Sequence, residues 1–208
     1  MIKRVIFDLD NTLIDFPKDY EIHFQSVLDK HNLNIKGKDL FKAIGSYELD
    51  ENTKYYEIDK LLNTVNKTLN LNCTKELLED FFLMYNKLIT PVSSSVIETL
   101  EYLKDKYELV ILTNWFTNSQ KERLKEAGIL KYFDKVYGTD IIPMKPYKEC
   151  FNEVIGDLKP NECVMIGDNL NIDIKVPYEM GMNVFHLNKF GNTKYPTIRK
   201  IEDLKEEL

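Results

Sequence analysis

The sequence predicts an α/β fold, a doubly wound, Rossmann-like parallel sheet with a helical lobe inserted after its first strand. The first observation is a series of short apolar runs that alternate with helix-like stretches beyond residue 90, a pattern typical of βα units. The second is the segment 16–90, where amphipathic helical patterns appear without a clear strand. Right-handed crossovers between the βα units would bring the strands into one parallel sheet.

The elements of the sheet follow the chain in order. Strands are expected at residues 5–7, 109–112, 136–137, 164–166 and 184–187, and the intervening helices at 94–106, 119–127, 147–157 and 170–181. Gly128, Gly156 and Gly181 stand at or near the ends of three of these helices, where glycine often takes up the left-handed conformation that stops a helix.

The inserted segment should form a lobe of its own. Its apolar stripes predict helices over 18–31, 38–45, 54–69 and 75–88, and a proline lies near each join, at Pro17 and Pro91. We therefore expect one domain built from residues 1–15 and 91–208, and a second from 16–90. Tyr47, Tyr55 and Tyr56 of the lobe are candidates for ligand contacts, although packing inside the lobe is the commoner fate of such side chains.

Composition narrows the class of protein. The 208 residues carry a net charge of −6 with acidic and basic residues interspersed, which provides no basic surface for binding nucleic acid. Neither a signal peptide nor a membrane-spanning run is evident, so we expect a cytoplasmic protein. Cys73, Cys150 and Cys163 are widely spaced and form no Cys-x-x-Cys pair, which favours reduced thiols over disulfides or a thiolate zinc site. The sequence leaves the oligomeric state open.

Asp8 and Asp10 point to a reaction centre. They follow the apolar run Val5–Phe7, and residues two apart in a strand share a face, so both carboxylates would enter one small volume. Two such charges repel unless a cation or a shared proton relieves them. A bound Mg²⁺, which prefers oxygen ligands, would neutralise the pair and also admit a phosphate dianion.

Further polar residues follow three later strands. Ligands of open α/β sheets bind beyond the carboxyl ends of the strands, so these positions should meet Asp8 and Asp10. They are Thr113 and Asn114, Lys145 before Pro146, and Asp168 and Asn169 after Gly167 with Asp173 nearby. A helix cap or turn could also explain the Thr–Asn pair, and capping the helix near 170 could explain the acids. A second source of carboxylates is nevertheless what a magnesium site beside the first pair requires.

Together these residues carry a resemblance to the haloacid dehalogenase superfamily, whose four ordered motifs lie at successive strand ends. The matching segments are Asp8-Leu9-Asp10-Asn11-Thr12, Thr113-Asn114, Lys145-Pro146, and Gly167-Asp168-Asn169 with Asp173. The match spans the chain, and the segment 16–90 lies where the superfamily's first type of cap domain is inserted. The resemblance implies a catalytic core with a helical cap and a Mg²⁺ cofactor.

The resemblance also implies roles for single residues. Asp8 would attack phosphorus and Asp10 would act as general acid and base, while Mg²⁺ would be bound by the carboxylates of Asp8 and Asp168 and by the backbone carbonyl of Asp10. Thr113 and Asn114 would hold the phosphoryl group, and Lys145 would offset its charge. Asp173 and Asn169 would contact the catalytic residues and not the substrate, and Asp173 would orient Lys145 or a metal-bound water.

The acid at position 10 favours the phosphatases and phosphomutases of the superfamily over its dehalogenases and transport ATPases. Hydrolysis of a small phosphorylated metabolite, such as a nucleoside monophosphate or a sugar phosphate, is the preferred reading. The segment from Thr113 to Thr117 resembles pyrimidine nucleotidase-like enzymes, with Trp115 in place of their usual glycine, and a phosphoglycolate phosphatase-like enzyme is the related alternative. A phosphomutase of the same superfamily is an alternative hypothesis. A binding module that has lost catalysis is another, although such a module would normally lack at least one of Asp8, Asp10, Lys145 and Asp168, and all four are present.

Overall fold

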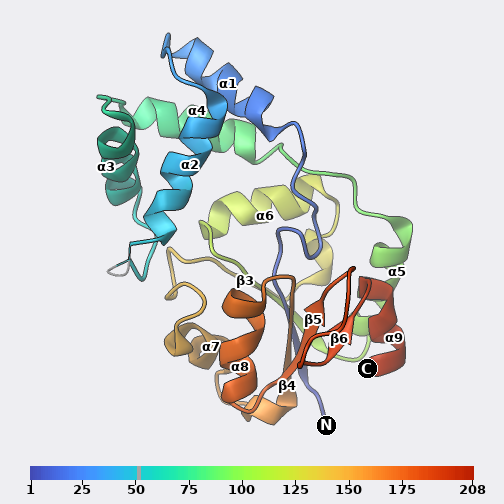
Figure 1. Cartoon of the computed structure of the whole chain (residues 1–208). Helices are drawn as coiled ribbons and strands as arrows, with labels where there is room; N and C mark the ends of the chain where they lie inside the picture. Colours follow the sequence, from blue (N-terminus) through green and yellow to red (C-terminus); the bar gives the residue numbers. More distant parts are fainter. Residues whose placement is uncertain (51–52) are drawn as a thin grey trace.

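The computed structural model describes residues 1–50 and 53–208, and it confirms the predicted fold class. Six parallel strands form one sheet in the order β3-β2-β1-β4-β5-β6 (Figure 1). Their bounds are β1 Arg4–Phe7, β2 Glu108–Leu112, β3 Lys135–Tyr137, β4 Cys163–Gly167, β5 Asn183–Leu187 and β6 Thr197–Ile198. β1 lies at the centre, so the acids that follow it are flanked by the ends of β2 and β4.

Helices cover both faces of the sheet because its strands are apolar on both sides. Val5 and Phe7 of β1 pack with α5 (Ser94–Lys104), α6 (Thr117–Glu126) and α9 (Leu204–Glu207). Ile6, between them in the sequence, faces the other way and packs with α7 (Lys148–Ile155) and the turn before α8 (Lys175–Glu179). This alternation is the period of two expected for a strand buried on both faces. No described helix combines the length and the apolar character needed to cross a bilayer.

Four helices between β1 and α5 form a separate lobe, which we call the cap (Figure 1). They are α1 Tyr20–Lys30, α2 Gly37–Glu48, α3 Ile58–Leu69 and α4 Lys75–Tyr85, and they bury their apolar stripes in a cluster of their own. Three residues from core loops, Trp115, Phe116 and Met144, belong to the same cluster. The cap therefore has its own hydrophobic centre and also an apolar contact with the core.

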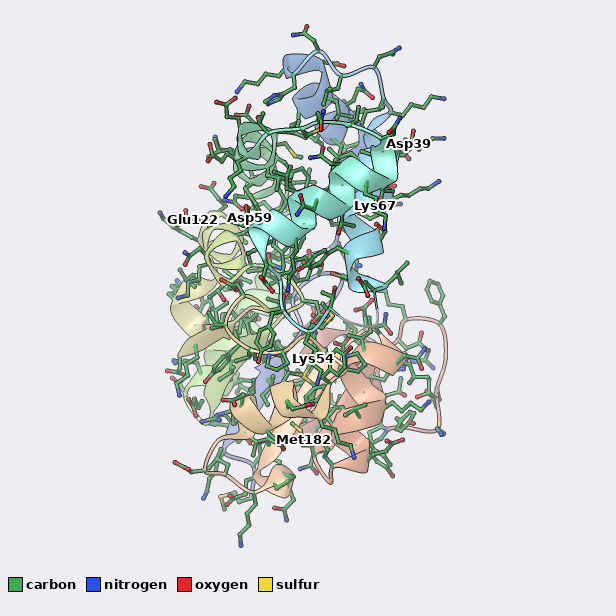
Figure 2. The ribbon with its side chains drawn as sticks, turned by 90° about the vertical axis from the view of Figure 1, so that its left-hand side faces the viewer. Asp39, Lys54, Asp59, Lys67, Glu122 and Met182 are labelled. Atoms are coloured by element: carbon green, nitrogen blue, oxygen red, sulfur yellow. The ribbon has the colours of Figure 1, made fainter. Side chains whose placement is uncertain are left out.

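The segment before α3 connects the cap to the core through its backbone. The Tyr56 N–H donates to the Thr139 carbonyl (2.8 Å), and the Met144 N–H donates to the Lys54 carbonyl (2.7 Å). Lys54, which Figure 2 shows between the cap helices and the core, also pairs with Glu149 of α7 at 3.0 Å. These contacts with the core explain why α3 begins at Ile58 and not at residue 54 as predicted, because a helical pattern does not reveal a backbone that pairs elsewhere.

Other differences from the predicted elements have local causes. The expected helix 170–181 is divided into a π-helical turn, Leu170–Ile174, and the short α8. Pro177 lies in the first turn of α8, where its missing N–H costs no hydrogen bond. The two-residue strand β6 was not predicted, because a pairing this short leaves no periodic signal. Short 3₁₀ turns at Leu130–Tyr132, Pro160–Glu162 and Ile201–Asp203 complete the core.

Candidate active site

A cavity of about 390 Å³ lies between the carboxyl ends of the strands and the cap. The residues predicted from the sequence to form the site all line it: Asp8, Asp10, Thr113, Asn114, Lys145, Asp168, Asn169 and Asp173. The parallel sheet explains this convergence, since β1, β2 and β4 all end at the same edge. Cap residues form the rest of the wall.

Lys145 lies at the centre of the acidic end of the cavity. Its Nζ is 2.7 Å from Asp8 Oδ1 and 2.7 Å from Asp173 Oδ1, and the lysine is almost completely buried. Burial alone would lower the pKa of Lys145, but the charges of Asp173 and Asp8 outweigh it and raise the pKa above its ordinary value. The ammonium is therefore held in its charged form beside Asp8. The second oxygen of Asp8 accepts a hydrogen bond from the Thr12 hydroxyl at 3.2 Å.

Three carboxylates could hold a metal ion together. Asp8, Asp168 and Asp173 each have an oxygen within 4.8 Å of the other two. Burial, together with the charge of Asp8, raises the pKa of Asp168 to about 6, so its ionised form lacks sufficient neutralisation from the protein alone. A hard divalent cation with oxygen ligands fits this donor set. Gly167 is required here, because a Cβ at this position would lie 2.5 Å from Asp173 Oδ2.

Asp10 points to a buried guanidinium that the sequence analysis missed. Arg123 of α6 is fully buried, and its Nη1 lies 2.7 Å from Asp10 Oδ1. Gln120, one turn earlier, donates to Asp10 Oδ2 at 3.1 Å and to the Thr113 hydroxyl oxygen at 2.9 Å. The sequence did contain a signal, because Gln120 and Arg123 share the helix face of the buried Leu124, an unusual place for an arginine.

Thr113 and Asn114 differ in what they offer to a ligand. The Thr113 hydroxyl accepts from Gln120, which leaves its own proton available to a bound group. The Asn114 side chain is engaged by the backbone of Lys145: its Oδ1 accepts from the Lys145 N–H (2.8 Å) and its Nδ2 donates to the Lys145 carbonyl (2.9 Å). Asn114 therefore fixes the loop that carries Lys145, and its second Nδ2 proton and its backbone N–H are the donors left for a ligand.

The cap side of the cavity is largely aromatic. Trp115, at the position of the expected glycine, places its ring 5.2 Å from that of Tyr56 and 5.3 Å from that of Tyr85. Of the three candidate tyrosines, only Tyr56 lines the cavity. Tyr47 is buried behind it, and Tyr55 is exposed elsewhere. Glu48, which the sequence analysis did not single out, also lines the cavity.

The chain is similar to known proteins over most of its length. It is 23% identical to the HAD-hydrolase YfnB of Bacillus subtilis, over 97% of this chain and 93% of that protein. The crystal structure of YfnB bound to magnesium superposes with a TM-score of 0.77 at 21% identity, covering 100% of this chain and 98% of the other. A glyceraldehyde 3-phosphate phosphatase of Methanothermobacter thermautotrophicus is 28% identical (90% and 86% covered), and the pyrimidine 5'-nucleotidase PynA of Streptococcus pneumoniae is 25% identical (89% and 84% covered).

The model of one family covers most of the chain. Residues 2–177 match the haloacid dehalogenase-like hydrolases, and this range contains all of the predicted site residues. The structural similarity to YfnB extends over the cap as well as the core. The resemblance carried by the four strand-end motifs is thereby confirmed, and the chain belongs to the haloacid dehalogenase-like hydrolase family.

Proposed function

We propose that this protein is a Mg²⁺-dependent phosphatase that hydrolyses small phosphorylated metabolites through an aspartyl-phosphate on Asp8. The observation that carries the proposal is the position of the Asp8 carboxylate, between the charged Lys145 and the acidic cluster at one end of a capped cavity. A nucleophile, a positive charge and candidate metal ligands are thus close together. The names of two relatives, a glyceraldehyde 3-phosphate phosphatase and a pyrimidine nucleotidase, support a small phosphate ester as substrate.

The first step would transfer the phosphoryl group to the protein. An oxygen of Asp8 forms a bond to phosphorus while the bond between phosphorus and the ester oxygen breaks. Asp10, with Arg123 and Gln120 at its carboxylate, gives its proton to the departing oxygen, so that a neutral alcohol leaves. Lys145 offsets negative charge on the phosphoryl oxygens, and Thr113 donates its hydroxyl proton to one of them.

The second step would restore the free enzyme. A water oxygen bonds to phosphorus, Asp10 takes up a proton from that water, and the bond between phosphorus and Asp8 breaks. Inorganic phosphate leaves and Asp8 is again a carboxylate. Asp173 keeps the Lys145 ammonium beside Asp8 through both steps, and the Asn169 N–H holds Asp173 Oδ2 at 3.0 Å.

The residues fit a bound Mg²⁺. It would be held by the carboxylates of Asp8 and Asp168 and by the backbone carbonyl of Asp10, and when bound it supplies positive charge that offsets the phosphate dianion. The proximity of the Asp8 and Asp168 carboxylates and the raised pKa of Asp168 support these two ligands from within the chain, while Asp173 of the same cluster is bonded to Lys145. The magnesium bound to YfnB supports the Mg²⁺ assignment from a relative.

A generic phosphate ester tests the proposal. Purified protein should release phosphate from p-nitrophenyl phosphate in the presence of Mg²⁺ and not in the presence of a chelator, and a panel of phosphorylated metabolites should then identify better substrates. Product analysis separates the alternative, because a phosphomutase would convert one sugar phosphate into another without releasing phosphate. Absence of Mg²⁺-dependent phosphate release on every ester would overturn the proposal.

A further inference from the structure

One acidic side chain of the cap reaches the cavity. Glu48 is the last residue of α2, which runs from the far end of the cap toward the core (Figure 1). Among the described cap residues that line the cavity, Glu48 is the only one with a charged side chain. The wall around it is apolar, with Phe41, Ile44 and Phe81 as examples. The carboxylate is therefore the one charge that the described part of the cap contributes to the cavity wall, within electrostatic range of Lys145, Asp10 and Asp8 on the core side.

Tyr56 holds this carboxylate in place. Its hydroxyl donates to Glu48 Oε1, and its ring is buried between the rings of Tyr47 (4.9 Å) and Trp115 (5.2 Å). The backbone N–H of Tyr56 donates to the core carbonyl of Thr139 at 2.8 Å. Glu48 is thus fixed both to the cap and, through Tyr56, to the core. A carboxylate oriented in this way is a defined recognition group and not a mobile surface charge.

No basic group of the described residues neutralises Glu48. No described lysine, arginine or histidine lies within 4.0 Å of its carboxylate, and Lys145 across the cavity is already paired with Asp8 and Asp173. Glu48 is exposed, but loss of solvent on its cavity side raises its pKa, and the hydrogen bond from Tyr56 and the more distant charge of Lys145 oppose this rise only in part. Glu48 Oε1 accepts from the Tyr56 hydroxyl, and among the described residues none donates to Glu48 Oε2, which can therefore accept from a ligand.

We propose that Glu48, oriented by Tyr56, is the group that recognises the leaving group, and that it selects esters whose leaving group offers hydroxyl donors and carries no carboxylate. The inference rests on the proposed phosphatase function and narrows its substrate class to sugar or polyol phosphates. Hydroxyl groups of the substrate donate to the free oxygen of Glu48, and the apolar wall packs against the carbon skeleton. A leaving group with a carboxylate places a second negative charge against Glu48, and no cap cation of the described residues compensates for it.

Two substrates of matched size test this selection. Glycerol 3-phosphate and 3-phosphoglycerate share a three-carbon skeleton and differ by a hydroxymethyl group in place of a carboxylate. The wild-type protein should have a kcat/KM for glycerol 3-phosphate at least about tenfold above that for 3-phosphoglycerate. Glu48→Gln keeps the size and the hydrogen bond with Tyr56 but removes the charge. This variant should reduce the ratio by about tenfold, chiefly because its kcat/KM for 3-phosphoglycerate rises.

Two pairs of variants separate recognition from folding. Tyr56→Phe releases Glu48 and should reduce the ratio in the same direction. Tyr47→Phe removes another buried cap hydroxyl, one that bonds to the Tyr55 carbonyl and the Glu57 N–H, and it should leave the ratio unchanged. Glu57→Gln is the matched control for Glu48→Gln, because Glu57 pairs with Lys60 at the surface and does not line the cavity.

The outcomes distinguish the two proposals. If the protein with Mg²⁺ releases no phosphate from p-nitrophenyl phosphate, glycerol 3-phosphate or 3-phosphoglycerate, the phosphatase assignment itself fails. If phosphate is released but the wild type uses 3-phosphoglycerate as well as glycerol 3-phosphate, the phosphatase assignment stands and the role of Glu48 is refuted. An unchanged ratio in a folded Glu48→Gln protein refutes it as well.

Discussion

Arg123 Nη1 lies 2.7 Å from Asp10 Oδ1 and 2.9 Å from Asp10 Oδ2, so one guanidinium nitrogen contacts both oxygens of the carboxylate. The arginine is itself held in place, since its guanidinium lies 4.6 Å from the centre of the Tyr85 ring, in a cation–π contact. α6 therefore sets the orientation of the side chain proposed to transfer the proton. This orientation comes from a helix 113 residues later in the sequence and not from the loop that carries Asp10.

Replacing Arg123 by Met should lower kcat about 10²-fold and leave KM nearly unchanged. Met retains an apolar stem but leaves Asp10 free to turn, and small displacements of a catalytic group have effects of this size. Arg123→Lys should recover part of the activity, because it restores a charge at the same depth. Steady-state kinetics on p-nitrophenyl phosphate would measure both effects.

Arg4 provides the control for this experiment. It pairs with Glu108 through its own guanidinium but lies outside the cavity. Arg4→Met should lower the melting temperature without a selective fall in kcat. If Arg123→Met and Arg4→Met reduced activity only in proportion to lost folded protein, the positioning role of Arg123 would be excluded.

Asp8 and Asp10 should respond differently to the same substitution. Asp8→Asn removes the proposed nucleophile and should abolish turnover, whereas Asp10→Asn should slow it by on the order of 10² to 10⁴ because only proton transfer is impaired. Circular dichroism should show that both variants remain folded. Near-normal turnover by Asp8→Asn would mean that water, and not Asp8, attacks phosphorus.

The sequence predicted the sheet and its motif residues well because both have short-range signals. Apolar runs mark β1, β2 and β4, and the polar residues at their ends need only the parallel arrangement to come together. The contributions of α6 and of the cap depend on contacts between distant segments: the place of Arg123 on the buried face of α6 marks it as unusual, but it does not identify its partner. Arg123 meets Asp10 across 113 residues of sequence, and Glu48 reaches the cavity only because α2 is oriented by packing against other cap helices.

The loop residues also show why some roles could not be read from the sequence. Asn114 was expected to bind phosphate through its side chain, and the structure adds a second role that the sequence did not indicate: its amide pairs with the backbone of Lys145, 31 residues later. Likewise, the position of the segment from Lys54 to Tyr56 depends on backbone partners in the core. Long-range hydrogen bonds of this kind follow from the assembled fold and not from local periodicity.

Removing divalent metal should abolish phosphatase activity, and Mg²⁺ should restore it. Ca²⁺ should restore it poorly, because its larger and looser coordination suits the cluster less well. A second measurement does not depend on turnover: Mg²⁺ should raise the melting temperature of the wild type, because a ligand that binds only the folded state stabilises it. Asp168→Asn should weaken this shift. Full activity in the presence of a chelator would contradict the assignment.

The stability of the metal-free protein should depend on pH through Asp168 and also through Asp173, whose pKa burial raises to about 7. The folded-state pKa of about 6 lies above the ordinary value for an aspartate, so the folded state binds this proton more tightly than the unfolded chain. Stability should therefore fall as the pH rises from about 4 to about 6, by about 1–3 kcal/mol. Asp168→Asn should make this fall shallower in urea unfolding and leave the part that is due to Asp173. An equally steep fall in that variant would assign the whole effect to Asp173 or another group.

The protein should hydrolyse small phosphate esters, and it should not hydrolyse a phosphate ester on the side chain of a folded protein. The cap forms one wall of the cavity and contacts the core through Trp115 and through the backbone of Tyr56, so we expect it to keep a phosphorylated side chain on a large surface away from Asp8. The test compares p-nitrophenyl phosphate with a folded protein that carries phosphotyrosine. Both are aryl phosphate esters, and they differ in the size of the leaving group. We expect kcat/KM to be at least about 10²-fold lower for the protein substrate, because a closed site must admit the whole leaving group. A tyrosine phosphate on a short flexible peptide provides the intermediate case. Comparable kcat/KM on the folded phosphoprotein and on the small ester would show that the cap does not limit access to Asp8.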